Sequence, residues 1–535
     1  MKKIFMAAFV LAMTVPAAAQ DTYESARLLG SDLNGTARYV GMGGAMDALG
    51  ADISTMGTNP AGIGLFRHST VSASLGLVSQ QDAQKFDGLN KTNMSFDQLG
   101  FVYSTRISRT SFVNVGFNYH KSKNFDQILS AANRLVNCSQ NGLSYHKDQI
   151  GYVNQGGYYL DFNTDNDLIG YESQTSDYRA QTFTQADYLN ANVLMLDPDD
   201  HKIYYNDANG YTFDRAHRGW INDYDVNLSG NVNDRFYWGF TIGFHDVRYK
   251  GYSEYGETLV AGAGNEECGS VVYGDQRDIK GTGIDLKAGI IFRPVEESPF
   301  RLGLSVATPT WYDLTTSNET YMLNNSRFGQ WDNGRSGESY DFHFNTPWKF
   351  GLSMGHVIGG QVAIGAGYEY TDYSASQNRI NSGNYDYYGE EDSYTDEIMK
   401  VNTERSLKGV STFKVGMEIK PDPTVALRIG YNYVTAGYEK DGVRDTKINS
   451  PGVAYASTTD YTNWKDTHRL TLGMGYRLNA WNVDLAYQYS ATNGDFHPFQ
   501  EYPADPTSNY AGQRVFDSKV SNKRHQLLLT VGYTF

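Results

Sequence analysis

The sequence contains no uninterrupted apolar run of about 20 residues, which is the length that a transmembrane helix needs. Its mean hydropathy is −0.51, the value of a rather polar chain. These two features exclude a helical membrane protein.

Cysteine is nearly absent, because the 535 residues include only Cys138 and Cys268. Neither residue has the CxxC spacing of a metal or redox site. Both fall in segments that we expect to be external loops, where a disulfide between them is one interpretation. Two free thiols are the other interpretation, because a sequence does not give the distance between two side chains.

Motifs that would indicate catalysis or nucleic-acid binding are scarce as well. The HExxH and Walker patterns are absent, and the 11 histidines show no metal-ligand spacing. The net charge of −15 argues against a nucleic-acid partner. We therefore predict a protein that is not an enzyme and carries no cofactor or metal, with an outer-membrane hydrolase built from Ser, His and Asp as a weaker alternative.

The N-terminus has the pattern of a secretory signal peptide. Lys2 and Lys3 precede the apolar run 4–15, and a small-residue stretch ends at Ala19. We predict a signal peptide over 1–19, with cleavage after Ala19. The mature chain would then lie outside the cytoplasm.

Aromatic residues and glycine are abundant, with 41 Tyr, 26 Phe and 55 Gly. After residue 68 we identify about fourteen segments in which apolar and polar residues alternate, as in strands that tilt across a bilayer. The clearest such segments are 413–420, 425–433, 469–478 and 481–489. We therefore predict an all-β fold, a transmembrane antiparallel β-barrel of about 14 strands over 68–535.

The two faces of these strands differ in a way that assigns the lumen. The apolar face is bounded by tyrosine and tryptophan, as at the membrane interfaces of outer-membrane barrels, and is expected to contact outer-membrane lipids. The polar face, which we expect to line the lumen, carries charged residues at Asp285, Lys287, Arg301, Lys349, Glu369, Arg428 and Arg469.

The predicted connections alternate between short and long, as periplasmic turns and extracellular loops do. The short ones are 108–109, 231–234, 293–299, 357–360, 420–423 and 478–480. The long ones are 81–95, 122–219, 248–279, 312–344, 374–406, 437–463 and 491–521, of which 122–219 is the largest. An even strand count places both ends of the barrel on the periplasmic side.

The last strand, 525–535, ends in Phe535. This ending resembles the terminal recognition signal of proteins that the outer-membrane assembly machinery inserts. With the signal peptide and the barrel pattern, it predicts a location in the outer membrane of a Gram-negative bacterium.

The segment 36–67 precedes the first strand and is rich in glycine and alanine, which allow a short helix to pack closely against a neighbour. It is interrupted at Pro60, because proline cannot continue a helix. We predict that 20–67 forms a partly helical hatch that plugs the lumen.

The small-residue run, Asp47, Asp52, the pair Ser54 and Thr55, and the turn Asn59-Pro60-Ala61 together resemble the hatch of the FadL/TodX/OmpP1 family of outer-membrane barrels. The resemblance implies a monomeric transporter for hydrophobic small molecules such as long-chain fatty acids. It further implies capture at extracellular loops, an apolar luminal pocket beside the hatch, and release sideways into the membrane.

Other functions remain open at this point. Some FadL-like barrels act as secretion-system shuttles that bind a protein partner, and others have been labelled haem or haemin receptors. An open porin is a weaker candidate, because porins lack such a hatch.

The candidate ligand-binding residues lie in the hatch. They are Met46, Leu49, Ile53, Met56, Ile63, Leu65 and Phe66. The alternative is that these side chains only wedge the hatch against the barrel wall. We expect Asn59, Pro60 and Ala61 to fix the hatch turn, with ligand contact as a second role.

A second candidate site lies in the segment 122–219. Its apolar residues at helical spacing are Ile128, Leu129, Leu135, Val136, Leu189, Val193 and Leu194. They could form an external capture groove, or instead a small core that holds the segment together.

Overall fold

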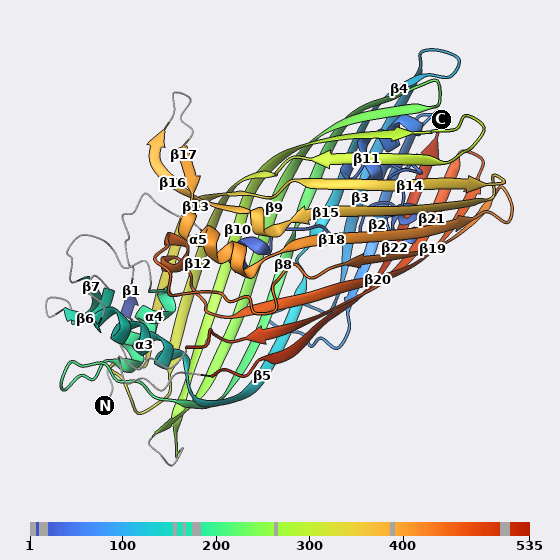
Figure 1. The fold of residues 1–535 in the computed structure, drawn as a ribbon. Helices are drawn as coiled ribbons and strands as arrows, with labels where there is room; N and C mark the ends of the chain where they lie inside the picture. Colours follow the sequence, from blue (N-terminus) through green and yellow to red (C-terminus); the bar gives the residue numbers. More distant parts are fainter. Residues whose placement is uncertain are drawn as a thin grey trace.

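The computed structural model describes residues 20–153, 158–163, 167–173, 183–261, 266–385, 391–502 and 514–535, and the backbone of 7–9. Fourteen strands form one closed antiparallel barrel (Figure 1). They are β2 (Thr70–Gln80), β3 (Thr92–Arg106), β4 (Phe112–Asn124), β8 (Ala208–Val232), β9 (Phe236–Ala261), β10 (Glu266–Phe292), β11 (Arg301–Ala307), β14 (Lys349–Ile358), β15 (Val362–Asp372), β18 (Gly409–Ile419), β19 (Val425–Val434), β20 (Tyr461–Leu478), β21 (Trp481–His497) and β22 (Ser518–Thr534).

The barrel closes between its first and last strands. β2 pairs with β22 along its whole length, from Thr70 opposite Thr534 to Gln80 opposite Arg524. Closure leaves no barrel edge unpaired, which is a requirement for a sheet that crosses a membrane. The predicted barrel of about 14 strands is confirmed.

The outer surface of the barrel is apolar. In β20, Leu470, Leu472 and Met474 are 49, 50 and 53 % exposed, whereas Thr471 between them is buried in the lumen. The same alternation runs through β19, where Leu427 and Ile429 face outward. So much exposed apolar surface suits contact with lipid, so the strands span a membrane with their polar face inward.

The predicted short connections all occur, at one end of the barrel. They join β3 to β4, β8 to β9, β10 to β11, β14 to β15, β18 to β19 and β20 to β21. The start of β2 and the end of β22 lie at this same end, because Thr70 pairs with Thr534.

At the other end, one side of the barrel continues far beyond the bilayer. β8, β9 and β10 contain 25, 26 and 27 residues, whereas a tilted membrane strand needs about 9–11. Further strands extend this sheet on both sides, in the order β5–β8–β9–β10–β12–β13–β16–β17. The added strands are β5 (Gln127–Cys138), β12 (Trp311–Asn324), β13 (Asn333–Asn345), β16 (Gln377–Tyr385) and β17 (Glu391–Thr395).

The expectation of long loops is therefore wrong for much of this region. Segments 122–219, 312–344 and 374–406 contain the added strands, and 248–279 belongs almost wholly to β9 and β10. The reason is that these strands pair outside the bilayer, where no apolar outer face is needed to mark them.

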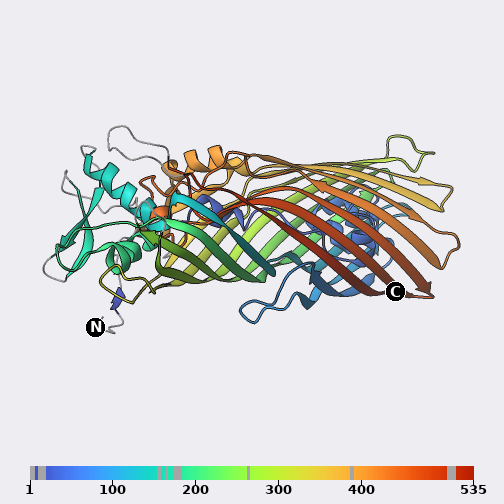
Figure 2. The ribbon, with the colours of Figure 1, turned by 90° about the horizontal axis from the view of Figure 1, so that it is seen from below.

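A cap of small elements lies at the far end of the extended sheet (Figures 1 and 2). It consists of α3 (Gln140–Val153), β6 (Tyr158–Asn163), β7 (Leu168–Ser173), α4 (Gln185–Leu189) and the π-helical turn η3 (Asn190–Met195). Smaller helices lie between strands, namely η4 (Tyr373–Ala375), α5 (Glu397–Ser406) and α6 (Pro451–Ala454). No helix in the described part of the chain is long and apolar enough to cross a bilayer.

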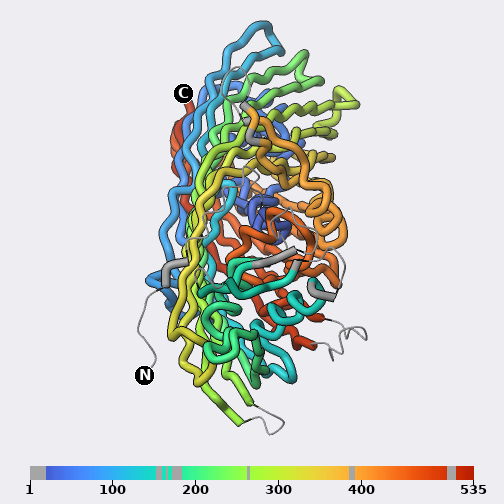
Figure 3. The backbone as a smooth tube through the Cα atoms, turned by 90° about the vertical axis from the view of Figure 1, so that its left-hand side faces the viewer, coloured from blue at the N-terminus to red at the C-terminus, as the bar shows by residue number. Residues whose placement is uncertain are grey.

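Residues 20–67, here called the plug, lie inside the barrel, in blue in Figure 3. The plug contains α1 (Thr22–Ala26), α2 (Ala37–Gly41), η1 (Ile53–Gly57) and η2 (Pro60–Leu65). Each begins at an acidic, hydroxyl or amide N-cap, namely Asp21, Thr36, Asp52 and Asn59. Of the predicted signal peptide 1–19, only β1 (Ala7–Phe9), which pairs with β13, lies within the described residues.

Candidate functional site

The plug contacts the barrel wall closely through small residues. A Cβ atom added to Gly41 would lie 3.1 Å from the Cα atom of Gly473 in β20. At Gly43, with φ of +63°, an added Cβ would lie 2.8 Å from the backbone nitrogen of Tyr431. The glycine run of the plug thus allows the backbones of plug and wall to approach each other.

Buried ion pairs tie α2 and the following turn to the wall. Lys414 of β18 lies 3.2 Å from the carboxylate of Asp47 in the plug and 2.5 Å from Glu369 of β15. Glu418 accepts from Arg38 of the plug at 3.2 Å and from Arg428 at 2.6 Å. Burial raises the pKa of Asp47, and Lys414 opposes that shift.

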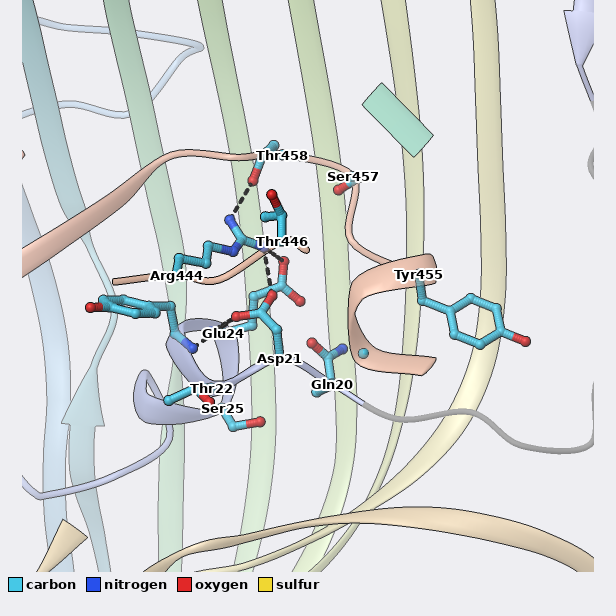
Figure 4. A network of polar contacts seen from close by, with 12 residues as sticks. Gln20, Asp21, Thr22, Glu24, Ser25, Arg444, Thr446, Tyr455, Ser457 and Thr458 are labelled. Carbon is cyan, nitrogen blue, oxygen red and sulfur yellow. Dashed lines mark hydrogen bonds and ion pairs between the residues drawn. The ribbon is translucent and has the colours of Figure 1, made fainter. Parts of the chain in front are cut away.

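The first residues of the plug are held at the extracellular end, beside α6 (Figure 4). Arg444 donates to Asp21 at 2.6 Å and to Glu24 at 3.1 Å. Arg277 of β10 also pairs with Glu24 and donates to Ser457 at 2.8 Å. Burial raises the pKa of Glu24, whereas Arg277 and Arg444 lower it. The plug therefore runs from the periplasmic end to the extracellular loops.

The apolar hatch candidates fill the space between plug and wall. Met46 and Leu49 belong to one buried cluster, and Ile53, Met56, Ile63 and Phe66 form another with Val102 of β3. Leu65 packs against a third cluster that contains Ala61 and wall residues of β9 and β10. Ile53, Phe66, Leu49 and Leu65 also line cavities at the periplasmic end.

The turn Asn59-Pro60-Ala61 begins η2. The side chain of Asn59 accepts a hydrogen bond from the backbone N–H of Ala61 at 3.2 Å, and Pro60 occupies the first helical position. Proline is favoured there because that position needs no N–H donor. The geometry fits the turn-fixing role, and ligand contact stays a prediction.

The apolar residues of 122–219 lie in three elements, β5, α4 and η3. The helical interpretation of Ile128, Leu129, Leu135 and Val136 is wrong, because all four lie on β5, where Ile128 and Leu129 pair with β8. Pairs of apolar neighbours suit a strand whose two faces are both covered, which sequence spacing alone does not distinguish from a helix.

Most of these side chains are buried rather than arranged along an open groove. Leu129, Leu135, Leu189, Val193 and Leu194 share one core between β5, the cap and the extended sheet. Ile128 packs in a separate small cluster, and Val136 is 47 % exposed. The capture role stays a prediction that would require this core to open.

Cys138 and Cys268 are both free thiols in this structure. Cys138 is fully buried and Cys268 packs partly buried against the same core. No disulfide therefore joins β5 to β10 within the extended sheet.

One sequence match to a catalytic pattern has no catalytic geometry. Residues 351–355 read Gly-Leu-Ser-Met-Gly and match GxSxG, whose serine must sit on a sharp turn between strand and helix. Here the five residues lie within β14, and Ser353 is buried against Gly303. Among the described residues, no group of three His, Cys, Asp or Glu side chains could hold a metal ion.

A second polar cluster lines the wall near the plug. His245 lies 2.7 Å from Asp223 and 3.1 Å from Asp285. Lys287 lies 2.9 Å from Asp285 and 3.0 Å from Asp225. The prediction that Asp285 and Lys287 face the lumen is confirmed, and each has oppositely charged neighbours.

Two adjoining cavities lie between the plug and the extracellular end. The inner cavity, of about 180 Å³, is lined by Leu33 and Thr58 of the plug and by Lys349 and Glu369 of the wall. The outer cavity, of about 290 Å³, adjoins it at Asp32, Tyr373 and Arg469. Its lining includes Tyr23, Lys123, Tyr438, Trp464 and Arg524.

Two further cavities lie on the periplasmic side of the plug. The larger, of about 410 Å³, is lined by Arg38 and Phe66 of the plug and by Lys420 and Arg477 near the turns. The smaller, of about 230 Å³, includes Leu65 and Gln361. The plug thus separates extracellular from periplasmic cavities within one barrel.

These features define a plugged transmembrane β-barrel. The sequence matches no protein-family model and no protein of curated function. Among solved structures, the chain is similar to a Pseudomonas aeruginosa FadL homologue, with a TM-score of 0.50 and 13 % sequence identity over 95 % of this chain and 99 % of that chain. This similarity confirms the predicted FadL-type fold.

Two other solved structures are similar at lower scores. The Ralstonia pickettii toluene transporter TbuX gives a TM-score of 0.47 and 13 % identity over 94 % of this chain and 99 % of that one. The P. putida toluene transporter TodX gives a TM-score of 0.44 and 11 % identity over 94 % of this chain and 99 % of that one.

Proposed function

We propose that the protein is a monomeric outer-membrane channel that takes up small molecules with an apolar body, and that movement of the plug opens its path. The observation that carries this proposal is the pair of cavity systems on opposite faces of the plug. A barrel with a built-in plug suits selected passage better than free diffusion, because the plug blocks the lumen of the resting state.

The FadL-type fold and the hatch residues support an apolar cargo. Long-chain fatty acids and related apolar compounds are the class that the hatch resemblance implies. The capture of such molecules would begin among the extracellular elements. We assign the outer membrane because a closed barrel with an apolar outer belt fits that bilayer.

The hatch side chains have a role in this proposal only when the plug moves. Met46, Met56 and Ile63 are fully buried at the plug–wall interface. A shift of the plug would expose them to the lumen and give an apolar molecule a surface to follow. Asn59 and Pro60 would keep η2 intact during that shift.

The test combines uptake with ligand identification. Bacteria that lack other channels of this type would express the protein, and uptake of radiolabelled decanoate and toluene would be measured. The control is a variant in which Ala48→Cys and Gly303→Cys join plug to wall, since a Cβ added to Gly303 of β11 would lie 3.5 Å from the Cβ of Ala48, within the range of a disulfide. We expect uptake by the wild type, loss on oxidation of the variant and recovery on reduction.

Native mass spectrometry of gently purified protein gives the second readout. A co-purifying apolar molecule would support the channel. No uptake together with an empty lumen and a stoichiometrically bound protein would overturn the proposal in favour of the secretion shuttle.

A further inference from the structure

The outer cavity differs from the rest of the lumen in its charge balance. Six lysine and arginine side chains line it, namely Arg27 of the plug, Lys123 of β4, Arg215 of β8, Lys465 and Arg469 of β20 and Arg524 of β22. Arg215 pairs with Asp460 at 2.6 Å and Lys465 with Asp495 at 3.0 Å. Within the described residues, Arg27, Lys123 and Arg469 have no carboxylate within ion-pair distance, and Arg524 lies 3.9 Å from Asp32.

Neutral groups are the partners of these cations. Arg469 donates to the side-chain oxygen of Asn432 at 2.9 Å, and Arg27 donates to the hydroxyl of Tyr249 at 2.9 Å. Lys123 donates to the backbone carbonyl of Leu29. Of the two lining carboxylates, Asp460 is paired with Arg215, and Asp32 already accepts from the backbone N–H of Asn124 at 2.9 Å, so the cations outnumber the carboxylates.

This surplus of positive charge is unusual for the chain, whose net charge is −15. Partly desolvated cations without counter-charges are costly, because the protein interior replaces only part of their hydration. An anion in the cavity would offset this cost, so the lack of counter-charges indicates an anionic ligand.

Aromatic side chains form the rest of the lining. Tyr23 stacks on Tyr438 with ring centroids 5.4 Å apart and packs against Tyr461 at 5.1 Å. Tyr373 and Trp464 also line the cavity. Flat rings gain most from contact with other flat rings, whereas a flexible chain gains no such stacking.

We propose that the outer cavity binds an aromatic carboxylate, with its carboxylate at Lys123, Arg469 and Arg524 and its ring against Tyr438 and Trp464. This inference rests on the proposed function, because it names the cargo of the same lumen. A volume of about 290 Å³ is small for a ligand pocket, which suits a molecule of one or two rings.

Calorimetric titration of the purified full-length protein tests the proposal, with 2-naphthoate as the probe and 2-naphthalenemethanol as its neutral counterpart. We expect the acid to bind at least tenfold more tightly than the alcohol, and added salt to reduce only the affinity for the acid. Arg469→Gln and Lys123→Gln should each weaken binding of the acid about tenfold and change binding of the alcohol less than twofold.

Arg109→Gln is the matched control, because this arginine lies in an exposed periplasmic turn. Folding of each variant is checked by heat-dependent gel mobility. Equal affinities for acid and alcohol, no binding of either, or binding of decanoate but not of naphthoate would each overturn the inference.

Uptake of the same two compounds separates this inference from the proposed function. If both compounds are taken up but titration shows no preference for the acid, the proposed channel is supported and the anion site is contradicted. Tight, charge-dependent binding without uptake would leave the site standing and contradict the channel.

Discussion

The plug–wall interface and the outer cavity lie in the same lumen but handle charge in opposite ways. At the interface, Lys414 contacts two carboxylates, and Arg428 contacts Glu418 at 2.6 Å and Asp484 at 2.5 Å. In the cavity, Arg469 meets only the neutral side chain of Asn432.

The difference distinguishes charges that hold the plug in place from charges that are available to bind a ligand. A matched charge inside the lumen is satisfied without any ligand and fixes the position of the plug. A cation without a neighbouring carboxylate lacks a counter-charge until an anionic ligand binds. Both arrangements use the same residue types, so the partners, rather than the charges themselves, show which part of the lumen is structural.

Breaking a matched pair should have the largest effect. Lys414→Met leaves the carboxylates of Asp47 and Glu369 buried without their cation. We expect a loss of about 3–5 kcal/mol in unfolding free energy, measured by denaturant unfolding in lipid vesicles. Adding Asp47→Asn and Glu369→Gln to this variant should restore most of the lost stability. A loss below about 1 kcal/mol for Lys414→Met alone would contradict the structural role of Lys414.

Filling a close backbone contact should have the next largest effect. Gly416→Val places a side chain against the carbonyl of Met42, which cannot rotate away. We expect destabilisation of about 1–3 kcal/mol and a rise in single-channel ion conductance as the plug is displaced. Gly532→Val is the control, because the nearest atom to its added Cβ, the Val71 carbonyl oxygen, lies at 3.5 Å. Equal conductance in the two variants would contradict the prediction.

Removing an unmatched charge should change stability little. Arg469→Gln should lower the unfolding free energy by no more than about 1 kcal/mol or raise it, because only the hydrogen bond to the neutral Asn432 is lost and no carboxylate loses its partner. Arg428→Gln, also on the luminal face, provides the comparison and should cost several-fold more. Similar losses in the two variants, measured in the same unfolding assay, would remove the distinction between interface and cavity.

The smallest expected effect is a pH dependence of the cap. Burial raises the pKa of Asp148 in α3 to about 6, and the backbone N–H of Leu160 opposes the shift. A carboxyl whose folded-state pKa is raised stabilises the fold most when protonated, so cap stability should fall by up to about 2 kcal/mol from pH 4 to pH 7. Hydrogen exchange of cap amides, corrected for intrinsic rates, measures this fall. Asp148→Asn should abolish it, and a rise with pH would contradict the assignment.

The membrane part of the fold could be predicted from the sequence because lipid imposes a strict pattern. Leu427, Ile429 and Tyr431 face lipid, whereas the residues between them face the lumen. This alternation allowed both the strand and its lipid-facing side to be predicted. Outside the bilayer that constraint ends. Ile128 and Leu129 are neighbours in one strand, and both are buried because both faces of β5 are covered at this point.

The candidate site could be predicted only in part. The plug and its turn are contiguous in sequence, so Asn59 and the glycine run were visible. The outer cavity is lined by Arg27, Lys123, Arg469 and Arg524. These residues lie far apart in the sequence, and no motif or spacing predicts that they come together. Luminal charges such as Arg428 and Arg469 were recognised as facing inward, but their different partners depend on which strands become neighbours.

The unequal strand lengths also determine the direction from which molecules approach. β8, β9 and β10 have 25–27 residues, whereas β14, β15, β18 and β19 have 10 or 11, so the rim of the barrel is oblique (Figure 1). At about 3.3 Å per residue, the long side runs roughly 50 Å further along its strands. The tall wall shields the mouth on one side, whereas on the low side α5 and α6 lie against the first residues of the plug. A molecule bound for the lumen would therefore meet short helices on the low side and a continuous wall of paired strands on the other.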